Sequence, residues 1–342
     1  MTILGIESSC DETSAAVVRD GELLSNIISS QYFHSEFGGI VPELASRAHL
    51  RAALPIIREA LTDARVAVSG LGAVAATQGP GLIGSLLVGL NIGKALALSL
   101  EIPFLPIHHI EAHLFSTFLQ KPHPTFPFLG LAVSGGHTLL VRIDNIGSYT
   151  LLGSTIDDAA GEAFDKVGKM LGLGFPGGPA IDRCAALGNA DAHHFPRPLL
   201  DIDDYRFSFS GLKTSVLYHL RRRDKMEANS LSDDERNDIC ASFQAAVVDV
   251  LAGKTIRAAR EHGIRDIALV GGVSANSELQ RRLREDGLKN GMRVFIPDLI
   301  YSTDNAAMVA RLASLKLDQN EHGSLHAPAF ARIGDTLFDA HS

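Results

Sequence analysis

The chain opens with Thr2-Ile3-Leu4-Gly5-Ile6-Glu7-Ser8-Ser9-Cys10-Asp11-Glu12-Thr13. The apolar beginning predicts a strand over residues 2–9, and the polar residues 8–13 turn the chain into a second strand over residues 14–18. Asp20-Gly21 supplies the next turn. A β-hairpin with a polar loop is therefore expected to begin the fold.

The same order of elements returns in the second half of the chain. Residues 128–143 again predict a strand, a polar loop at Ser134-Gly135-Gly136-His137-Thr138 and a second strand. In each half a further apolar strand leads through a glycine loop toward a helix, at residues 73–81 and at residues 267–272. This pattern predicts an α/β protein with an internal duplication, in which the two hairpin loops face each other across a cleft.

The duplication predicts two domains, residues 1–127 and residues 128–342. Residues 155–240 are too long for a connection and are expected to add a helical insertion to the second domain. Whether the C-terminal segment packs back on the first domain is left open.

Composition limits the possible classes of protein. The chain has 342 residues, 46% of them hydrophobic, which favours two domains with buried cores. Its cysteines, Cys10, Cys184 and Cys240, form no CxxC pair, so neither a disulfide framework nor a thiolate zinc site is expected. No signal or membrane segment is apparent, and we expect a soluble, cytoplasmic protein. The net charge of −8 argues against a general nucleic-acid coat and leaves only local patches for RNA.

His109-Ile110-Glu111-Ala112-His113 suggests a metal site. On a helix these histidines share a face, with about 6 Å between their Cβ atoms, and can bind one ion together. Glu111 points to another side, and the H-E-x-x-H order of a zinc protease is absent. Asp304 is the candidate third ligand, and a His-His-Asp set suits Zn and Fe about equally. The alternative is a pair of surface or capping histidines, with the polar cluster Ser302-Thr303-Asp304-Asn305 as the N-cap of the helix that follows it.

Three diglycines follow apolar strands or punctuate loops: Gly135-Gly136, Gly177-Gly178 and Gly271-Gly272. Such loops let backbone N–H groups approach phosphates, so we expect a nucleotide in the cleft, with Asp165 or Asp182 accepting from its hydroxyls. Neither a P-loop nor a dinucleotide motif is present. Taken singly, each diglycine is also compatible with a simple tight turn.

Acidic residues add further candidates. Asp11 and Glu12 lie in the first hairpin loop and suit a general base or a metal-positioning or phosphate-positioning role, although paired acids in a turn are commonly solvated. A further acidic group is formed by Asp157, Asp158 and Glu162. A role in capping a helix end explains these residues as well as a role in the functional site does.

Basic runs are the candidates for RNA contacts on an acidic chain. One run is Arg221-Arg222-Arg223 with Lys225, and the other is Arg281, Arg282 and Arg284. Both are also compatible with solvated helix ends. Residues 206–214, which hold two aromatics, two serines and a lysine, suit either a packed loop or a docking surface.

Several segments together resemble the TsaD (YgjD/Gcp) family, from about residue 2 to about residue 335. They are Gly5-Ile6-Glu7-Ser8-Ser9-Cys10-Asp11-Glu12-Thr13, Pro42-Glu43-Leu44-Ala45-Ser46-Arg47, His109-Ile110-Glu111-Ala112-His113, Val133-Ser134-Gly135-Gly136-His137-Thr138, Asp157-Asp158-Ala159-Ala160-Gly161-Glu162-Ala163-Phe164-Asp165-Lys166 and Gly271-Gly272-Val273-Ser274-Ala275-Asn276. The resemblance implies an actin-like ATPase/sugar-kinase (RNase H-like) fold of two duplicated lobes. It also implies a tRNA N6-adenosine threonylcarbamoyltransferase, which modifies the adenosine 3' of the anticodon in tRNAs that read ANN codons.

The family's site residues carry over to matching positions of this chain. The resemblance implies one metal ion, Fe or Zn, held by His109, His113 and Asp304. It also implies contacts to the substrate from Ala132, Val133, Ser134, Gly135, Gly136, Asp165, Gly178, Asp182 and Asn276. The donor is expected to be threonylcarbamoyl-adenylate, and Asp11 is the hypothetical acceptor of the proton from the adenine amine. Whether ATP, ADP or the adenylate rests in the cleft is left open.

The resemblance also implies partners: tRNA, a TsaB-like paralogue, a TsaE-like P-loop ATPase and a separate synthase that makes the adenylate. Three alternatives remain. An actin-fold kinase would share the lobes but would need no metal-binding histidines, a metalloprotease is disfavoured by the position of Glu111, and a noncatalytic scaffold would tolerate loss of the metal ligands.

Overall fold

The computed structural model describes residues 1–31, 40–222, 231–321, 323–332 and 338. The chain forms two compact units. Unit 1 contains Met1–His123, Ile146–Ser148 and Pro297–Ser342, and unit 2 contains Pro124–Asn145 and Tyr149–Ile296. The C-terminal segment therefore belongs to the same unit as the N-terminal hairpin.

Unit 1 is built on a five-stranded sheet with the order β3-β2-β1-β4-β5. Its strands are β1 (Thr2–Glu7), β2 (Glu12–Arg19), β3 (Glu22–Ser30), β4 (Ala73–Gly79) and β5 (Phe104–His108). The expected hairpin is confirmed, since β1 and β2 pair antiparallel from Thr2 opposite Arg19 to Glu7 opposite Ser14. The next pairings, β1 with β4 and β4 with β5, are parallel.

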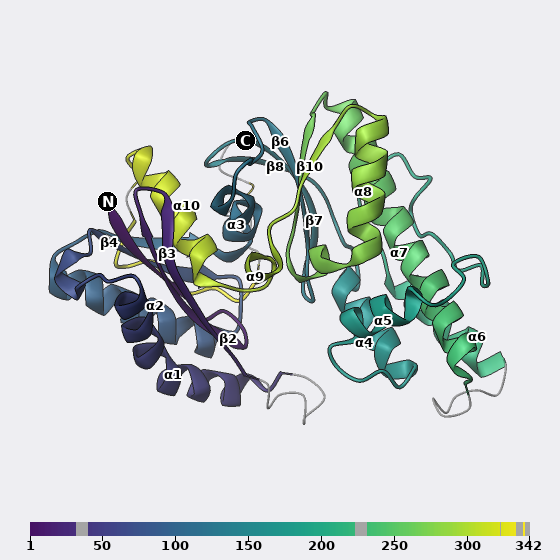
Figure 1. Ribbon diagram of the computed structural model, residues 1–342, viewed down its shortest axis with the longest axis horizontal. Coiled ribbons are helices and arrows are strands. Elements are labelled where there is room, and N and C mark those ends of the chain that lie inside the picture. Colours follow the sequence, from purple (N-terminus) through teal and green to yellow (C-terminus); the bar gives the residue numbers. More distant parts are fainter. Residues whose placement is uncertain (32–39, 223–230, 322, 333–337, 339–342) are drawn as a thin grey trace. The chain divides into compact units, whose positions relative to one another are not determined.

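Helices cover both faces of this sheet (Figure 1). They are α1 (Pro42–Asp63), α2 (Ile83–Leu100), α3 (His109–Leu114), α9 (Leu299–Ser302) and α10 (Ala306–Asp318), with short 3-10 turns at Val68–Gly70 and Ser116–Leu119. Leu4 and Ile6 face the core that α1 and α2 complete, and alternation along the strand sends Gly5 and Glu7 to the opposite face. A Cβ on Gly5 would lie 2.5 Å from the Ala306 carbonyl oxygen, so glycine lets α10 approach the sheet.

Unit 2 repeats the strand order of unit 1. Its sheet runs β10-β9-β6-β7-β8, with strands β6 (Phe128–Val133), β7 (Thr138–Asn145), β8 (Ser148–Ser154), β9 (Asp266–Val270) and β10 (Arg293–Phe295). In both units the first hairpin strand pairs antiparallel with the second and parallel with a strand that precedes a glycine loop. The predicted duplication and the α/β fold class are thus confirmed.

The helices of unit 2 surround a second core. They are α4 (Ala160–Met170), α5 (Gly177–Ala185), α6 (Ser210–Arg222), α7 (Asp233–Glu261) and α8 (Ser277–Lys289), with a 3-10 turn at Gly272–Ala275. The capping box expected at the start of α7 is confirmed, with Ser232 and Glu235 exchanging side-chain and backbone hydrogen bonds.

Two described helices, α2 and α7, are long and apolar enough to cross a membrane. In α7 the apolar window is 78% buried in the core of unit 2, whereas in α2 it is 39% buried and the helix packs against α1 and β4. The apolar character of α7 is therefore that of a buried core helix.

Candidate metal and donor site

A short helix, α3, presents the two histidines of the predicted metal pair. It starts directly after β5, where the His108 side chain accepts a hydrogen bond from the Glu111 backbone N–H at 3.4 Å. His109 and His113 lie one turn apart, are both buried, and have ring centroids 4.7 Å apart. The i, i+4 spacing thus brings both imidazoles to one side of α3, as predicted.

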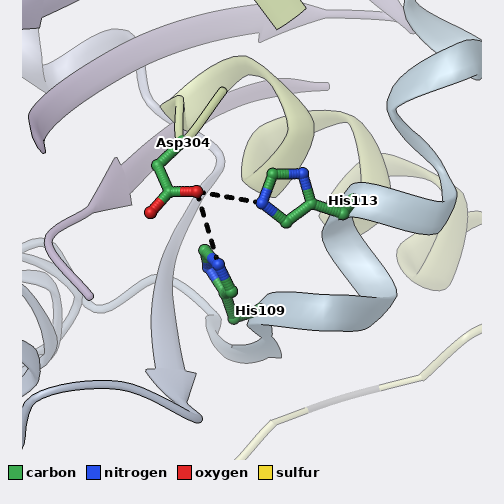
Figure 2. A group of neighbouring side chains, drawn as sticks. All are labelled: His109, His113 and Asp304. Atoms are coloured by element: carbon green, nitrogen blue, oxygen red, sulfur yellow. Dashed lines mark hydrogen bonds and ion pairs between the residues drawn. The ribbon is translucent and has the colours of Figure 1, made fainter. Parts of the chain in front are cut away.

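Asp304 completes this group from a distant part of the sequence. Its Oδ1 lies 3.5 Å from Nε2 of His109 and 3.0 Å from Nε2 of His113, and Figure 2 shows both rings directed at this one carboxylate oxygen. The N-cap predicted for the cluster at residues 302–305 is present, but Asp304 does not provide it. Asn305 caps α10 instead, and its side chain accepts from the Met308 backbone N–H at 3.1 Å.

The donor set fits a small transition-metal ion. The ligand atoms of His109, His113 and Asp304 all lie within 4.8 Å of one another. With bonds of about 2.0 to 2.2 Å, two ligands of a tetrahedral ion lie about 3.4 Å apart, which is close to the distances of 3.5 and 3.0 Å from Asp304 to the two histidines. Three protein ligands also leave a coordination position open for another molecule.

Glu111 takes no part in this group. It is buried, and its carboxylate pairs with Lys316 Nζ of α10 at 2.8 Å. This ion pair joins the helix of the two histidines to the helix that follows Asp304. The predicted orientation of Glu111 away from the histidines agrees with this pairing, and a general base of the protease type is missing from its expected place.

Several carboxylates act on the pKa values of groups at this site. Although burial opposes protonation, the nearby Asp304 and Glu7 carboxylates raise the pKa of His109 to about 9. Burial, together with the negative charges of Asp304 and Asp11, raises the pKa of Glu12 to about 10. Both shifts reflect an excess of negative charge in a buried place, and a bound cation would counter it.

The β1–β2 loop that carries Asp11 and Glu12 is held by His49 of α1. The buried His49 ring lies 2.7 Å from Thr13 Oγ1 through Nδ1 and 3.0 Å from the Cys10 carbonyl oxygen through Nε2. The carbonyl only accepts, so Nε2–H donates to it and Nδ1 accepts from the Thr13 hydroxyl. The Asp11 side chain is hydrogen-bonded to Glu12, which places two acids side by side in this loop.

The predicted substrate contacts belong to unit 2, whereas the residues described so far belong to unit 1. Ala132 and Val133 end β6, and residues 134–136 form the loop to β7. A Cβ on Gly135 or on Gly136 would meet nothing within 4 Å, so this glycine loop leaves open space beside its backbone. Gly161 of α4 approaches the loop closely, because its backbone N–H donates to the Ser134 carbonyl oxygen at 3.2 Å.

The remaining predicted contacts are tied to one another by hydrogen bonds. Asp165 of α4 accepts from the Gly177 backbone N–H at 2.7 Å and also from Gly178, and its burial raises its pKa. Asn276 donates to Asp182 of α5 at 3.2 Å while its own oxygen caps α8. These side chains therefore fix the start of α5 and the start of α8, in addition to any contact with a ligand.

Other singled-out residues have structural roles. Asp157 accepts from the backbone N–H groups of Phe209 and Ser210 at the start of α6. The segment from Arg206 to Thr214 is a packed loop and helix start, since Phe207 and Phe209 are fully buried. Glu162 pairs with Lys166 within α4.

The two basic runs differ in their surroundings. Arg281 pairs with two acids of its own helix, and Arg282 pairs with Asp249 of α7 at 3.3 Å. These ion pairs favour the solvated-helix interpretation for α8. Arg221 and Arg222 are exposed at the end of α6, while Arg223 and Lys225 lie outside the described residues.

Comparison with known proteins identifies the family of the chain. Residues 22–311 match the model of TsaD, described as tRNA N6-adenosine threonylcarbamoyltransferase. The chain belongs to the TsaD family. Relatives bearing that same name include those of Chloroherpeton thalassium, 52% identical over 97% of both chains, and Syntrophotalea carbinolica, 53% identical over 90% of both. The relative in Ralstonia pickettii is 48% identical over 93% of this chain and 92% of its own.

Solved structures support the fold of this TsaD family member. HypF of T. kodakarensis has a TM-score of 0.62 at 16% identity, covering 93% of this chain and 48% of HypF. Component A of the Acidaminococcus fermentans (R)-2-hydroxyglutaryl-CoA dehydratase has a TM-score of 0.53 at 17% identity, covering 93% and 99%. These neighbours have the actin-like ATPase fold, as expected from the duplicated units.

Proposed function

We propose that this chain transfers the threonylcarbamoyl group from threonylcarbamoyl-adenylate to N6 of the adenosine 3' of the anticodon in tRNAs that read ANN codons. The product is N6-threonylcarbamoyladenosine. Membership of the TsaD family supports transfer to tRNA adenosine. The observation that carries the metal-dependent form of the proposal is the convergence of His109 and His113 on the Asp304 carboxylate.

The metal ion, Fe or Zn, would be held by His109, His113 and Asp304. Bound there, it would polarise and orient the carbonyl of the threonylcarbamoyl group. Binding of the donor's remaining parts is assigned to Ala132, Val133, Ser134, Gly135, Gly136, Asp165, Gly178, Asp182 and Asn276. The open space beside residues 134–136 and their exposed backbone support contact with the adenylate or, at rest, with ATP or ADP.

The chemical step exchanges one bond for another. The adenine N6 forms a bond to the carbamoyl carbon, the bond from that carbon to the phosphate oxygen breaks, and AMP leaves with the bonding electrons. The proton from N6 goes to Asp11 in this scheme. The position of Asp11 beside Glu12, in a loop fixed by His49, supports a defined place for this acid.

A transfer assay tests the proposal directly. The purified chain, an unmodified tRNA and synthetic threonylcarbamoyl-adenylate are mixed with its partner proteins, and nucleosides are measured by mass spectrometry. The modified nucleoside should appear only with the chain present. Sugar-dependent ATP turnover without tRNA modification would instead support a kinase.

Metal content is the second readout. The wild-type protein should hold about one transition-metal ion per chain, and His109→Ala or His113→Ala should remove it, since two remaining ligands are too few for tight binding. Elemental analysis of each folded variant measures this. Full retention of the ion in both variants would reject the site, and unchanged transfer by both would support a scaffold role for these residues.

The partners and location complete the proposal. We infer that the chain works in the cytoplasm with a TsaB-like paralogue, a TsaE-like P-loop ATPase and a separate synthase for the adenylate. Family membership supports this inference. Reconstitution that omits each protein in turn measures its contribution, and full transfer with the chain alone would contradict the need for partners.

A further inference from the structure

A buried carboxylate lies behind the predicted metal pair. Glu7 is the last residue of β1, has no exposed surface, and points to the sheet face opposite the α1–α2 core. A buried carboxylate is costly unless several donors satisfy it, so its neighbours reveal its role.

Three donors surround Glu7. Oε1 accepts from the Ser9 backbone N–H at 2.6 Å, and Oε2 accepts from the Thr77 hydroxyl at 2.6 Å. Oε2 also lies 3.2 Å from Nδ1 of His109. Ser9 lies in the β1–β2 loop that follows Glu7, and Thr77 lies in the neighbouring strand β4. Together these two donors fix the carboxylate in place.

The contact with His109 defines which nitrogen faces the metal position. An ionised carboxylate only accepts, so Nδ1 of His109 carries the proton of this hydrogen bond. Nε2 is the nitrogen that faces Asp304, at 3.5 Å. In neutral imidazole a proton on Nδ1 leaves the Nε2 lone pair free to bind a metal.

We propose that Glu7 is the positioning residue of the metal site, which holds His109 in the tautomer and orientation that bind the ion through Nε2. This inference rests on the metal site proposed above. A carboxylate behind a histidine ligand orients the ring and makes the metal-binding nitrogen more basic, and its loss typically costs about 10- to 100-fold in metal affinity.

The two histidines differ in the hydrogen bonds that their Nδ1 atoms make. Nδ1 of His113 is buried without a hydrogen-bond partner among the described residues, whereas Nδ1 of His109 has Glu7 and, at 3.3 Å, the Ser9 hydroxyl. A serine hydroxyl is uncharged and rotates freely, so we assign the positioning role to Glu7.

The experiment measures metal affinity by competition with a chelator, using Zn²⁺ and the full-length protein. Glu7→Gln keeps the size of the side chain but removes its charge, and should weaken Zn²⁺ binding by about 10- to 100-fold. Ser9→Ala should change affinity much less. Asp266→Asn is the matched control, because Asp266 is an equally buried carboxylate in unit 2 with donors from Thr125 and Arg293.

The outcomes separate this inference from the metal site itself. If His113→Ala abolishes Zn²⁺ binding while Glu7→Gln keeps wild-type affinity, the role of Glu7 is overturned and the site stands. If both variants bind as the wild type does, the site is wrong and the role of Glu7 falls with it. A purely structural role would lower the melting temperature of the metal-free Glu7→Gln protein without changing its affinity.

A measurement on the wild-type protein covers the case in which Glu7→Gln does not fold. Long-range ¹H–¹⁵N NMR of the Zn²⁺-loaded protein reports the tautomer of each histidine, with His109 assigned by comparison with His109→Ala. We expect a slowly exchanging proton on Nδ1 of His109. A proton on Nε2 instead, or a ring bound to Zn²⁺ through Nδ1, would overturn the proposal.

Discussion

At the scale of single residues, the proposed transfer of the reaction's proton depends on the pair Asp11 and Glu12. The raised pKa of Glu12, about 10, keeps this acid protonated at neutral pH when no cation is bound, and its hydrogen-bonded neighbour is Asp11. One proton is thus held within a pair of adjacent acids. This arrangement resembles acid pairs in which one member serves as a base because the other retains the proton.

The base assignment predicts a loss of rate without a loss of binding. Asp11→Asn should lower the single-turnover transfer rate by about 10²- to 10⁴-fold and leave donor affinity nearly unchanged. Glu12→Gln is the matched control, since it removes the neighbouring acid and should cost less. Preformed adenylate and rapid quenching measure the rate, and equilibrium binding measures affinity. Equal losses of rate and affinity for Asp11→Asn would reject its role as the base.

The residues of the metal group were predictable to different degrees. His109 and His113 follow from the local geometry of a helix, in which residues four positions apart lie on the same face. Asp304 was only a candidate, because its approach to His113 joins positions 191 residues apart in the sequence. Glu7 was missed as a positioning residue. A charged residue that ends an otherwise apolar strand was the available signal, since such a charge needs buried partners.

At the scale of elements, Asp158 connects two helices of unit 2. Its carboxylate pairs with Lys166 of α4 at 3.0 Å and with Lys213 of α6 at 2.6 Å. Burial alone would raise the pKa of Asp158, but these two lysines outweigh it and hold the pKa below its usual value. The folded state thus prefers the ionised acid, and this preference stabilises the packing of α6 against α4.

This link predicts a pH-dependent loss of stability. Asp158→Asn should lower the free energy of unfolding of unit 2 by about 1 to 2 kcal/mol at pH 7. Because the folded pKa is depressed, the contribution of Asp158 is complete above its unfolded pKa of about 3.9 and disappears as pH falls through the folded pKa. Urea denaturation at several pH values measures it. Asp144→Asn, which removes only a pair within β7, should cost about 0.5 kcal/mol or less, and a pH-independent difference for Asp158→Asn would contradict the prediction.

Elements were easier to predict than their grouping. The hairpins, the glycine loops and the capping box of α7 depend on short segments whose period and turn residues are visible in the sequence. The assignment of α10 to the sheet of unit 1 is not local. It depends on the fit of Ala306 and Ala310 against Gly5, across about three hundred residues of chain, and no periodic pattern shows that contact.

At the scale of the whole molecule, the two proposed binding functions belong to different units. His109, His113 and Asp304 lie in unit 1, whereas Ser134, Asp165, Asp182 and Asn276 lie in unit 2. The duplication explains this division, since each unit has its own sheet and its own hairpin loop. The loop of unit 1 carries acids beside a candidate metal group, and the loop of unit 2 carries glycines beside open space.

This division predicts that metal and donor protect different parts of the chain from hydrogen exchange. Zn²⁺ should slow exchange in α3 and at the start of α10, because the ion would join these two segments through His109, His113 and Asp304. A non-reactive analogue of threonylcarbamoyl-adenylate, added to metal-free protein, should slow exchange in residues 132–138 and at the start of α5. Exchange followed by mass spectrometry of peptides measures both, and the second half of α8, where Arg282 pairs with Asp286, serves as an internal reference. Protection by Zn²⁺ confined to unit 2 would contradict the metal site, and protection by the analogue confined to α3 would contradict the assignment of the donor to unit 2.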